Sequence, residues 1–420
     1  MGQEQTSAGA VLPDSNTAKL SAMETVDNRA AAVVSWMLHD GRSKMTRARE
    51  WGSEMCERIV AAGIPIVHTF LYVGTLHPQV AASGYTWRRG EARATRVPIE
   101  HGIEALPGFA QSPLMAALQT RQLVRRRLEN LASFDFSDLA EFRGKRGSDY
   151  VALPMVCSNG EVNVISFMTD QPGGFSENDI AALEEVSRAL GVVVELQSTR
   201  RIAKTLLDTY VGARTGFRVL SGSIRRGTGE TIRAVIWIND LRGFTAASES
   251  LERDELLALL NDYFEILVQA VLAEHGEVLK FIGDGMLAVF ELQPDETPTA
   301  RCAAALRAAR NAIAGVVLRN RKRRVERRPE IDFGIALHLG EVYYGNIGAP
   351  ERLDFTVIGP AVNQTSRLEK LGSELDRIVV ASGNFAVAAS EPLEFLGVYS
   401  LRGIADPQKV FALPISLKID

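Results

Sequence analysis

Residues 277–290 read EVLKFIGDGMLAVF, and this stretch decides the fold. Two apolar segments flank Gly283-Asp284-Gly285, and an Asp-Gly pair between such segments predicts a tight β-hairpin. Upstream, residues 232–238 read IRAVIWI, a short apolar strand that runs directly into Asp240. The residues between them have the apolar spacing of an amphipathic helix, which begins after a possible cap at Ser250. The expected order is therefore strand, helix, hairpin.

The two aspartates of these segments are expected at one edge of a sheet. A right-handed crossover makes strand 232–238 parallel to strand 277–282, which places Asp240 and Asp284 at the same carboxyl-terminal edge. Two carboxylates that converge there repel each other unless they are protonated or bridged by cations. A pair of Mg²⁺ ions roughly 3.5 to 4 Å apart would suit such a site and would clamp both oxygens of a phosphoryl transfer. Taken separately, Asp-Gly is also a common turn and Asp240 could simply cap a helix.

A later segment adds an amide and a guanidinium. Strands are expected at residues 332–338, 341–345 and 353–358, and Gly359-Pro360 then opens a helix. Asn363 and Arg367 are four residues apart on this helix and so share a face. Arg367 could instead pair with an acidic neighbour such as Glu369.

Four motifs in this order resemble the catalytic domain of the class III nucleotidyl cyclases, specifically an adenylate cyclase. They are residues 240–245 (DLRGFT), 280–290 (KFIGDGMLAVF), 338–348 (HLGEVYYGNIG) and 354–369 (DFTVIGPAVNQTSRLE). The resemblance covers residues 231–417. It implies an α+β fold (an α/β sandwich) with a ferredoxin-like βαββαβ core, and a homodimer in which two catalytic domains share composite active sites.

The same resemblance assigns roles residue by residue. Asp240 and Asp284 match the aspartates that bind two Mg²⁺ or Mn²⁺ ions, and Leu241 matches the position that adds a backbone carbonyl. Lys280 and Thr356 match the pair that recognises adenine. An ammonium and a hydroxyl can both donate to ring acceptors of adenine, whereas a guanine-selective member is expected to have an acidic residue in place of the lysine.

The remaining assignments concern the ribose and the phosphates. Asn363 matches the residue that orients the ribose, and Arg367 matches the one that stabilises charge at the α-phosphate in the transition state. Arg402 stands where family members often have a lysine that holds the polyphosphate. The backbone amides from Gly243 through Phe244 to Thr245 are expected to cradle phosphate as well.

The implied function is conversion of ATP to 3′,5′-cyclic AMP and pyrophosphate by in-line attack of the ribose 3′-hydroxyl on the α-phosphate. Two alternatives remain open at this point. One is a catalytically retired cyclase fold that serves as a nucleotide-binding regulatory module, and the other is a guanylate cyclase.

The region before the catalytic domain resembles a GAF-type sensor domain over residues 28–197. Ser158-Asn159-Gly160 predicts a hairpin between two β-rich segments, and Ser176 is the expected N-cap of a long helix. We expect a flexible leader at residues 1–27, a connecting helix at 198–230, and an unidentified small-molecule or protein regulator of this domain. The apolar positions that follow Ser176 fit either a dimer stalk or packing on the N-terminal sheet; they are Leu183, Val186, Leu190 and Val193.

The composition excludes several other functional classes. The chain has 420 residues and a formal charge of -4, so no global field favours nucleic acid. The basic run from Arg319 to Arg328 is expected to be a solvated loop. No uncharged apolar run reaches the roughly 18 to 20 residues of a membrane span. Three widely spaced cysteines fit reduced thiols, so a cytoplasmic location is expected.

Overall fold

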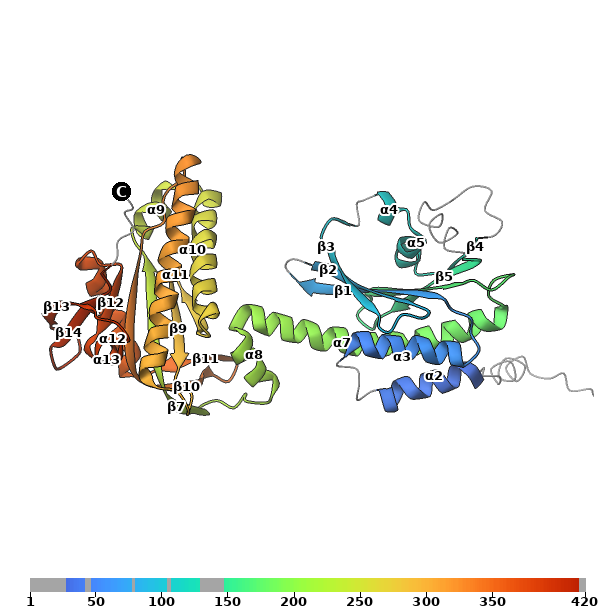
Figure 1. The fold of residues 1–420 in the computed structure, drawn as a ribbon, viewed down its shortest axis with the longest axis horizontal. Coiled ribbons are helices and arrows are strands. Elements are labelled where there is room, and N and C mark those ends of the chain that lie inside the picture. The colour runs from blue at the N-terminus through green and yellow to red at the C-terminus, as the bar shows by residue number, and fades with distance from the viewer. Residues whose placement is uncertain (1–27, 42–46, 78–79, 104–106, 129–146, 415–420) are drawn as a thin grey trace, which may run out of the picture. The chain divides into compact units, whose positions relative to one another are not determined.

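The computed structural model describes residues 28–41, 47–77, 80–103, 107–128 and 147–414, so the expected leader at 1–27 lies outside the described residues. The chain divides into two compact units, Met1–Thr205 and Leu206–Asp420 (Figure 1). Each unit has its own sheet and its own core. The fold is therefore mixed, with helices packed on sheets that are largely antiparallel.

The N-terminal unit is a six-stranded antiparallel sheet in the order β3-β2-β1-β6-β5-β4. Its strands are β1 (His68–His77), β2 (Val80–Arg88), β3 (Thr95–Glu100), β4 (Val124–Arg127), β5 (Asp149–Val156) and β6 (Val162–Thr169). Its helices are α2 (Asn28–Leu38), α3 (Ala48–Ala61), α4 (Pro107–Ala110), α5 (Pro113–Thr120) and most of α7 (Glu177–Val211). The predicted hairpin is confirmed as β5–β6, where Gly160 has a φ of 83°.

The two faces of this sheet are covered by different helices. Side chains of α2, α3 and α7 form one core with β5 and β6, while α4 and α5 pack on the opposite face (Figure 1). Leu183, Val186, Leu190 and Val193 of α7 are all buried in the first core. These four positions therefore pack on the N-terminal sheet, and the alternative of a dimer stalk built on them is wrong.

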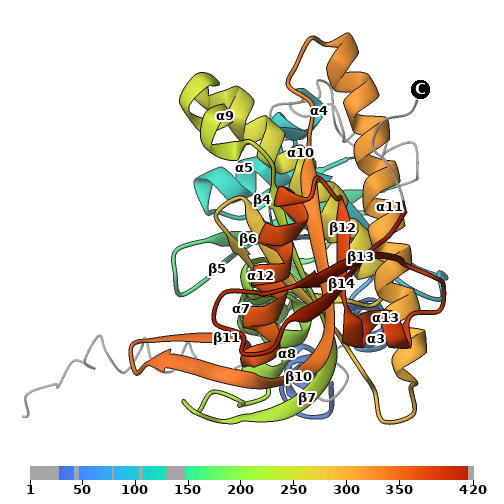
Figure 2. The ribbon, with the colours of Figure 1, turned by 90° about the vertical axis from the view of Figure 1, so that its left-hand side faces the viewer.

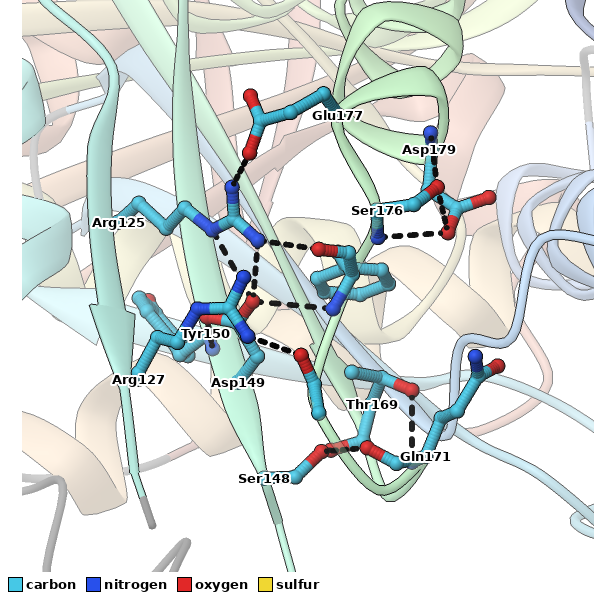
Figure 3. A network of polar contacts seen from close by, with 12 residues as sticks. Arg125, Arg127, Ser148, Asp149, Tyr150, Thr169, Gln171, Ser176, Glu177 and Asp179 are labelled. Carbon is cyan, nitrogen blue, oxygen red and sulfur yellow. Dashed lines mark hydrogen bonds and ion pairs between the residues drawn. The ribbon is translucent and has the colours of Figure 1, made fainter. Parts of the chain in front are cut away.

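The start of α7 is fixed by a buried polar network (Figure 3). Ser176 is the N-cap, as predicted, because its Oγ accepts a hydrogen bond from the Asp179 backbone N–H at 3.1 Å. Fully buried Asp149 accepts hydrogen bonds from Arg125 at 2.9 Å and from the Phe175 backbone N–H at 3.1 Å. Arg125 also donates to Glu177, the first residue of α7, at 2.7 Å. The charge of Asp149 is thus compensated, and the helix is anchored to β4 and β5.

The C-terminal unit is an eight-stranded sheet in the order β13-β14-β12-β10-β7-β9-β8, with β11 paired to β10. Its strands are β7 (Gly229–Leu241), β8 (Glu277–Ile282), β9 (Gly285–Glu291), β10 (Phe333–Ala349), β11 (Arg352–Ile358), β12 (Val379–Ser382), β13 (Glu394–Tyr399) and β14 (Gln408–Ala412). The predicted hairpin is β8–β9. Strands β7 and β8 run in the same direction, as expected, but β9 lies between them and pairs antiparallel with both.

Helices cover both faces of this sheet (Figure 2). They are α8 (Ala213–Leu220), α9 (Phe244–Ser250), α10 (Arg253–Ala273), α11 (Pro298–Val325), α12 (Pro360–Glu374) and α13 (Gly383–Ala388). Helices α10, α11 and α13 share the larger core, and α12 packs on the other face. The short helix α9 was not expected, and the N-cap of α10 is Glu252 rather than Ser250.

Two further expectations are corrected in this unit. Strand β10 is continuous from Phe333 to Ala349, so Gly340 does not separate two strands. A Cβ at Gly340 would lie 2.8 Å from the Ala361 Cβ, and the glycine therefore allows α12 to approach the sheet. The basic run 319–328 is mostly the end of α11, not a loop. Within it Arg323 is 1% exposed and pairs with Asp262 at 2.7 Å and Glu255 at 2.9 Å.

Helix α10 holds the end of β7 in place. Asn239, which is fully buried beside Asp240, accepts a hydrogen bond from the Trp237 indole and donates one to the Tyr263 hydroxyl, both at 2.6 Å. On length and composition alone, α10 is apolar enough to cross a membrane, and core helices of globular domains meet the same criterion. Leu259, Tyr263, Leu267 and Val271 of α10 lie in the core of this unit.

Candidate active site

Asp240 and Asp284 come together at one edge of the sheet. Asp240 is the next-to-last residue of β7, and Asp284 lies in the turn between β8 and β9. Because Asn239 is paired with Met286, this turn lies against the end of β7. A Cβ built on Gly285 would be 3.0 Å from the Asp240 Oδ1, so a glycine is needed beside the carboxylate. The sequence-based expectation that the two strand ends converge agrees with this geometry.

The two carboxylates interact electrostatically. Burial, followed by the charge and hydrogen bond of Asp284, raises the pKa of Asp240 from 3.8 to about 6. A divalent cation between the two groups would remove this penalty, and hard oxygen ligands of this kind suit Mg²⁺ or Mn²⁺. Over the described residues, no group of three or more His, Cys, Asp or Glu side chains is arranged to hold a metal ion. Mg²⁺ is usually coordinated by one or two protein carboxylates together with substrate phosphate oxygens, and the Asp240–Asp284 pair fits this preference.

A third carboxyl group, Glu369, was not anticipated as part of this site. It is 8% exposed on α12, and a Cβ on Gly334 would lie 3.3 Å from its Oε1. Gly334 is the β10 residue paired with Asp240. Burial, followed by the Asp240 charge, raises the pKa of Glu369 to about 7. The only sequence signal was its place at the end of the fourth motif.

The turn after Asp240 leads into a short helix. Gly243 has a φ of 69°, which places it in the left-handed region, and α9 begins at Phe244 and Thr245. The Arg242 backbone N–H is already used, because it donates to the Asp332 carbonyl at 2.8 Å. Leu241 is the last residue of β7, directly after Asp240. The phosphate contacts of these backbone groups stay predictions.

Lys280 and Thr356 belong to one polar cluster. The Lys280 Nζ donates to Asp354 of β11 at 2.7 Å. Thr356 lies two residues further along the same strand, so both side chains project on one face. The Thr356 hydroxyl is buried and makes no hydrogen bond within the described part of the chain. Asp354 was missed by the sequence reasoning, although it opens the fourth motif.

The α12 residues point in different directions. Asn363 is exposed and Arg367 half-buried, and neither side chain has an ion pair or hydrogen bond among the residues described. Arg367 therefore does not pair with Glu369 in this chain. Arg367 and Glu369 are two positions apart on α12, and two positions correspond to a rotation of about 200° around the helix axis. Because Glu369 faces Gly334 beside Asp240, Arg367 faces away from the two aspartates of its own chain.

Arg402 is also separate from the aspartates. It is exposed in the turn between β13 and β14. The register places this turn at the end of the sheet opposite Asp240, since β12 runs antiparallel to β7 and β14 antiparallel to β12. One chain thus groups Asp240, Asp284 and Glu369, and separately groups Lys280 with Thr356. It leaves Asn363, Arg367 and Arg402 outside the aspartate cluster.

Comparison with known proteins places these motifs in a family. Residues 230–412 match the family model of the adenylate and guanylate cyclase catalytic domain. Adenylate cyclase 1 of Rhizobium meliloti is 26% identical over 268 residues, which are 60% of this chain and 39% of that protein. An uncharacterised protein of Mycobacterium tuberculosis is 34% identical over 213 residues, or 51% of this chain and 37% of that protein. The chain thus spans less than two fifths of the length of these relatives.

Solved cyclase structures also resemble part of this chain. The adenylyl cyclase CyaB from P. aeruginosa is 23% identical, with a TM-score of 0.41, and the match covers 45% of this chain and 97% of that chain. The guanylyl cyclase Cya2 is 26% identical, with a TM-score of 0.39, and the match covers 44% and 92%. The family match rests on the sequence of residues 230–412. This part of the chain is a class III nucleotide cyclase catalytic domain.

Proposed function

We propose that the protein is an adenylate cyclase that converts ATP to 3′,5′-cyclic AMP and pyrophosphate. The observation that carries the proposal is the Asp240–Asp284 pair, whose mutual repulsion a divalent cation would relieve. Asp240 and Asp284 would hold two Mg²⁺ or Mn²⁺ ions, with the Leu241 carbonyl as a further ligand. When bound, such ions lower the pKa of the ribose 3′-hydroxyl and support the polyphosphate.

The choice of ATP over GTP is supported by the Lys280 cluster. Lys280 is held by Asp354 at 2.7 Å, and the unpartnered Thr356 hydroxyl can both donate and accept. A base with a ring acceptor and an adjacent amino group, as in adenine, satisfies both side chains. Asn363 would orient the ribose, and Arg367 would stabilise the negative charge that develops at the α-phosphate. Arg402 and the amides of Gly243, Phe244 and Thr245 would hold the remaining phosphates.

Product analysis tests this proposal directly. Purified protein is incubated with ATP or GTP in the presence of Mg²⁺ or Mn²⁺, and the products are separated and identified by mass. Cyclic AMP with pyrophosphate is expected from ATP, and Asp240→Asn provides the inactive control. Cyclic GMP as the main product would establish the guanylate cyclase alternative. Absence of both products, with nucleotide binding retained, would establish the retired regulatory module.

A homodimer completes the active site in this proposal. Arg367 faces away from Asp240 within one chain and has no partner among the described residues, which supports a site that it completes across a second chain. Asp240→Asn and Arg367→Ala should each inactivate the homodimer. In a mixed dimer both lesions fall in one site and the other site is intact, so mixing should restore roughly a quarter of the parental activity. No recovery, once exchange has been confirmed with separately tagged subunits, would refute the shared site.

We further propose that the N-terminal unit is a GAF-like sensor domain that regulates the cyclase. Helix α7 supports this, because it continues from the N-terminal core at Leu183 without interruption to Val211. A change in the packing of this helix would therefore be carried along one rigid element toward residue 211.

A further inference from the structure

The N-terminal unit contains a cavity of about 130 Å³ between its sheet and the helices α3 and α7. Apolar side chains from four elements form most of its wall, and they include Met55 of α3, Leu71 and Val73 of β1, Ile165 of β6, and Val193 and Val194 of α7. The volume is comparable to that of an engineered apolar cavity, roughly 150 Å³, that binds benzene. The cavity can therefore hold one aromatic ring, and a second ring could extend toward its mouth.

Two tryptophans contribute hydrogen-bond donors to this mostly apolar wall. Trp51 of α3 and Trp87 of β2 both line the cavity and are 6% and 4% exposed. The indole Nε1 of each is buried and has no hydrogen-bond partner within the described residues. A buried tryptophan normally places its N–H on an acceptor. Trp51 is also held in its orientation, because it stacks on Trp36 with ring centroids 5.5 Å apart.

Several other polar groups of the wall are already engaged. The Ser83 hydroxyl accepts a hydrogen bond from Arg96 at 3.0 Å, and the Thr86 hydroxyl is bonded to the His68 Nε2 at 3.0 Å. At the mouth, Arg201 donates to the Tyr85 hydroxyl at 3.0 Å. The two indole N–H groups are buried neutral donors, and neither has a partner among the described residues, so both are left for a ligand.

We propose that this cavity is a binding site for a small, neutral, planar heteroaromatic molecule of one or two rings that carries hydrogen-bond acceptors. The apolar walls would take the ring, and the Trp51 and Trp87 N–H groups would donate to ring nitrogens or carbonyl oxygens. Val193, Val194, Gln197 and Ser198 of α7 belong to the wall, so the occupant touches the helix that leaves this unit. The idea that this site regulates the cyclase rests on the proposed function, whereas the binding of a ligand in the cavity does not.

Binding is tested on the full chain with matched probes. Pyrazine and quinoxaline carry two acceptor nitrogens, while benzene and naphthalene have the same shapes without acceptors. The indole N–H signals of the ¹⁵N-labelled protein are followed by NMR during titration. The aza compounds should shift the Trp51 and Trp87 signals downfield and should bind roughly fivefold or more tightly than their hydrocarbon counterparts. Equal affinity of the two members of each pair, or no shift of either indole signal, would overturn the proposal.

Variants separate this site from general effects on the fold. Trp87→Phe keeps an aromatic ring but removes one indole N–H donor. The variant should therefore lose the part of the preference for the aza probes over the hydrocarbons that this donor supplies. Gly52 lies on α3 and lines the cavity, and a Cβ built on it meets no atom within 4 Å. Gly52→Leu should therefore block the binding of all four probes without loss of stability. Trp237→Phe, which removes an indole N–H in the C-terminal unit, should leave the preference unchanged. Unaltered binding in Gly52→Leu would place the probes elsewhere and refute the site. None of these measurements uses cyclase turnover, so failure here is distinct from failure of the proposed catalytic function.

Discussion

Asp240→Asn should stabilise the metal-free protein at pH 8 while it removes a carboxylate from the proposed metal site. The pKa of Asp240 rises from 3.8 to about 6 on folding, a change of about two units that corresponds to ~3 kcal/mol. Because the side chain is only half-buried, solvent screening reduces the expected gain to roughly 1 to 2 kcal/mol. For a unit of the size of Leu206–Asp420, this corresponds to an increase in Tm of about 2 to 8 °C.

The sign of the pH dependence follows from the raised pKa. A carboxyl group whose pKa is higher in the folded state lowers stability once it is charged, so the penalty is full above about pH 6 and absent below about pH 4. The gain from Asp240→Asn should accordingly disappear as the pH falls from 6 to 4. Thermal unfolding by calorimetry in the presence of EDTA measures this, with exposed Asp295→Asn as the matched control. A gain that is absent at pH 8, or equally large at pH 4, would refute the electrostatic argument.

Three other predictions test the base site, the helix and the core. Lys280→Glu should lower kcat/KM for ATP by roughly 10- to 100-fold, and Asp354→Asn, which keeps the ammonium, should lower it less; equal activity of Lys280→Glu and the parent would exclude the lysine as the adenine reader. Insertion of one to four alanines between Thr205 and Leu206 rotates the following part of α7 by about 100° per residue, so cyclase activity should vary with insertion length, and constant activity would make the helix a passive tether. Arg323→Ala should destabilise the catalytic unit by about 2 to 3 kcal/mol in denaturant unfolding and Arg319→Ala by less than about 1 kcal/mol, because Arg319 is 30% exposed; similar losses would contradict the ranking by burial.

Local patterns in the sequence were sufficient for much of the catalytic fold. The hairpin at Asp284 and the strand that leads into Asp240 were predictable, because turn chemistry and apolar periodicity are properties of neighbouring residues. The N-cap at Ser176 followed from the same kind of signal. Long-range pairing was not predictable in this way. The basic run was expected to be a loop because its charges indicated exposure to solvent. Arg323 is buried instead, and its charge is paired with Asp262 and Glu255, which lie some sixty residues earlier in the sequence.

The N-terminal unit shows a second limit of pattern reading. Positions 183, 186, 190 and 193 have a spacing that fits an interhelical seam and an intradomain core equally well, and only the packing on β5 and β6 decides between them. The cavity had no sequence signal either. Trp51 and Trp87 are far apart in the chain, and their shared feature is an indole N–H without an acceptor, which appears only after the sheet and α3 are assembled.

Helix α12 explains why the candidate site residues form two groups within one chain. Its inner face carries Leu368 and Glu369, and the burial of Glu369 against Gly334 sets the rotation of the helix on the sheet. With that rotation fixed, Arg367 cannot turn toward Asp240 without exposing Leu368, which is 1% exposed. The packing that stabilises the single domain thereby directs the guanidinium away from its own aspartates. This geometry supports the shared-site proposal, in which a second chain supplies the Asp240–Asp284 pair for Arg367.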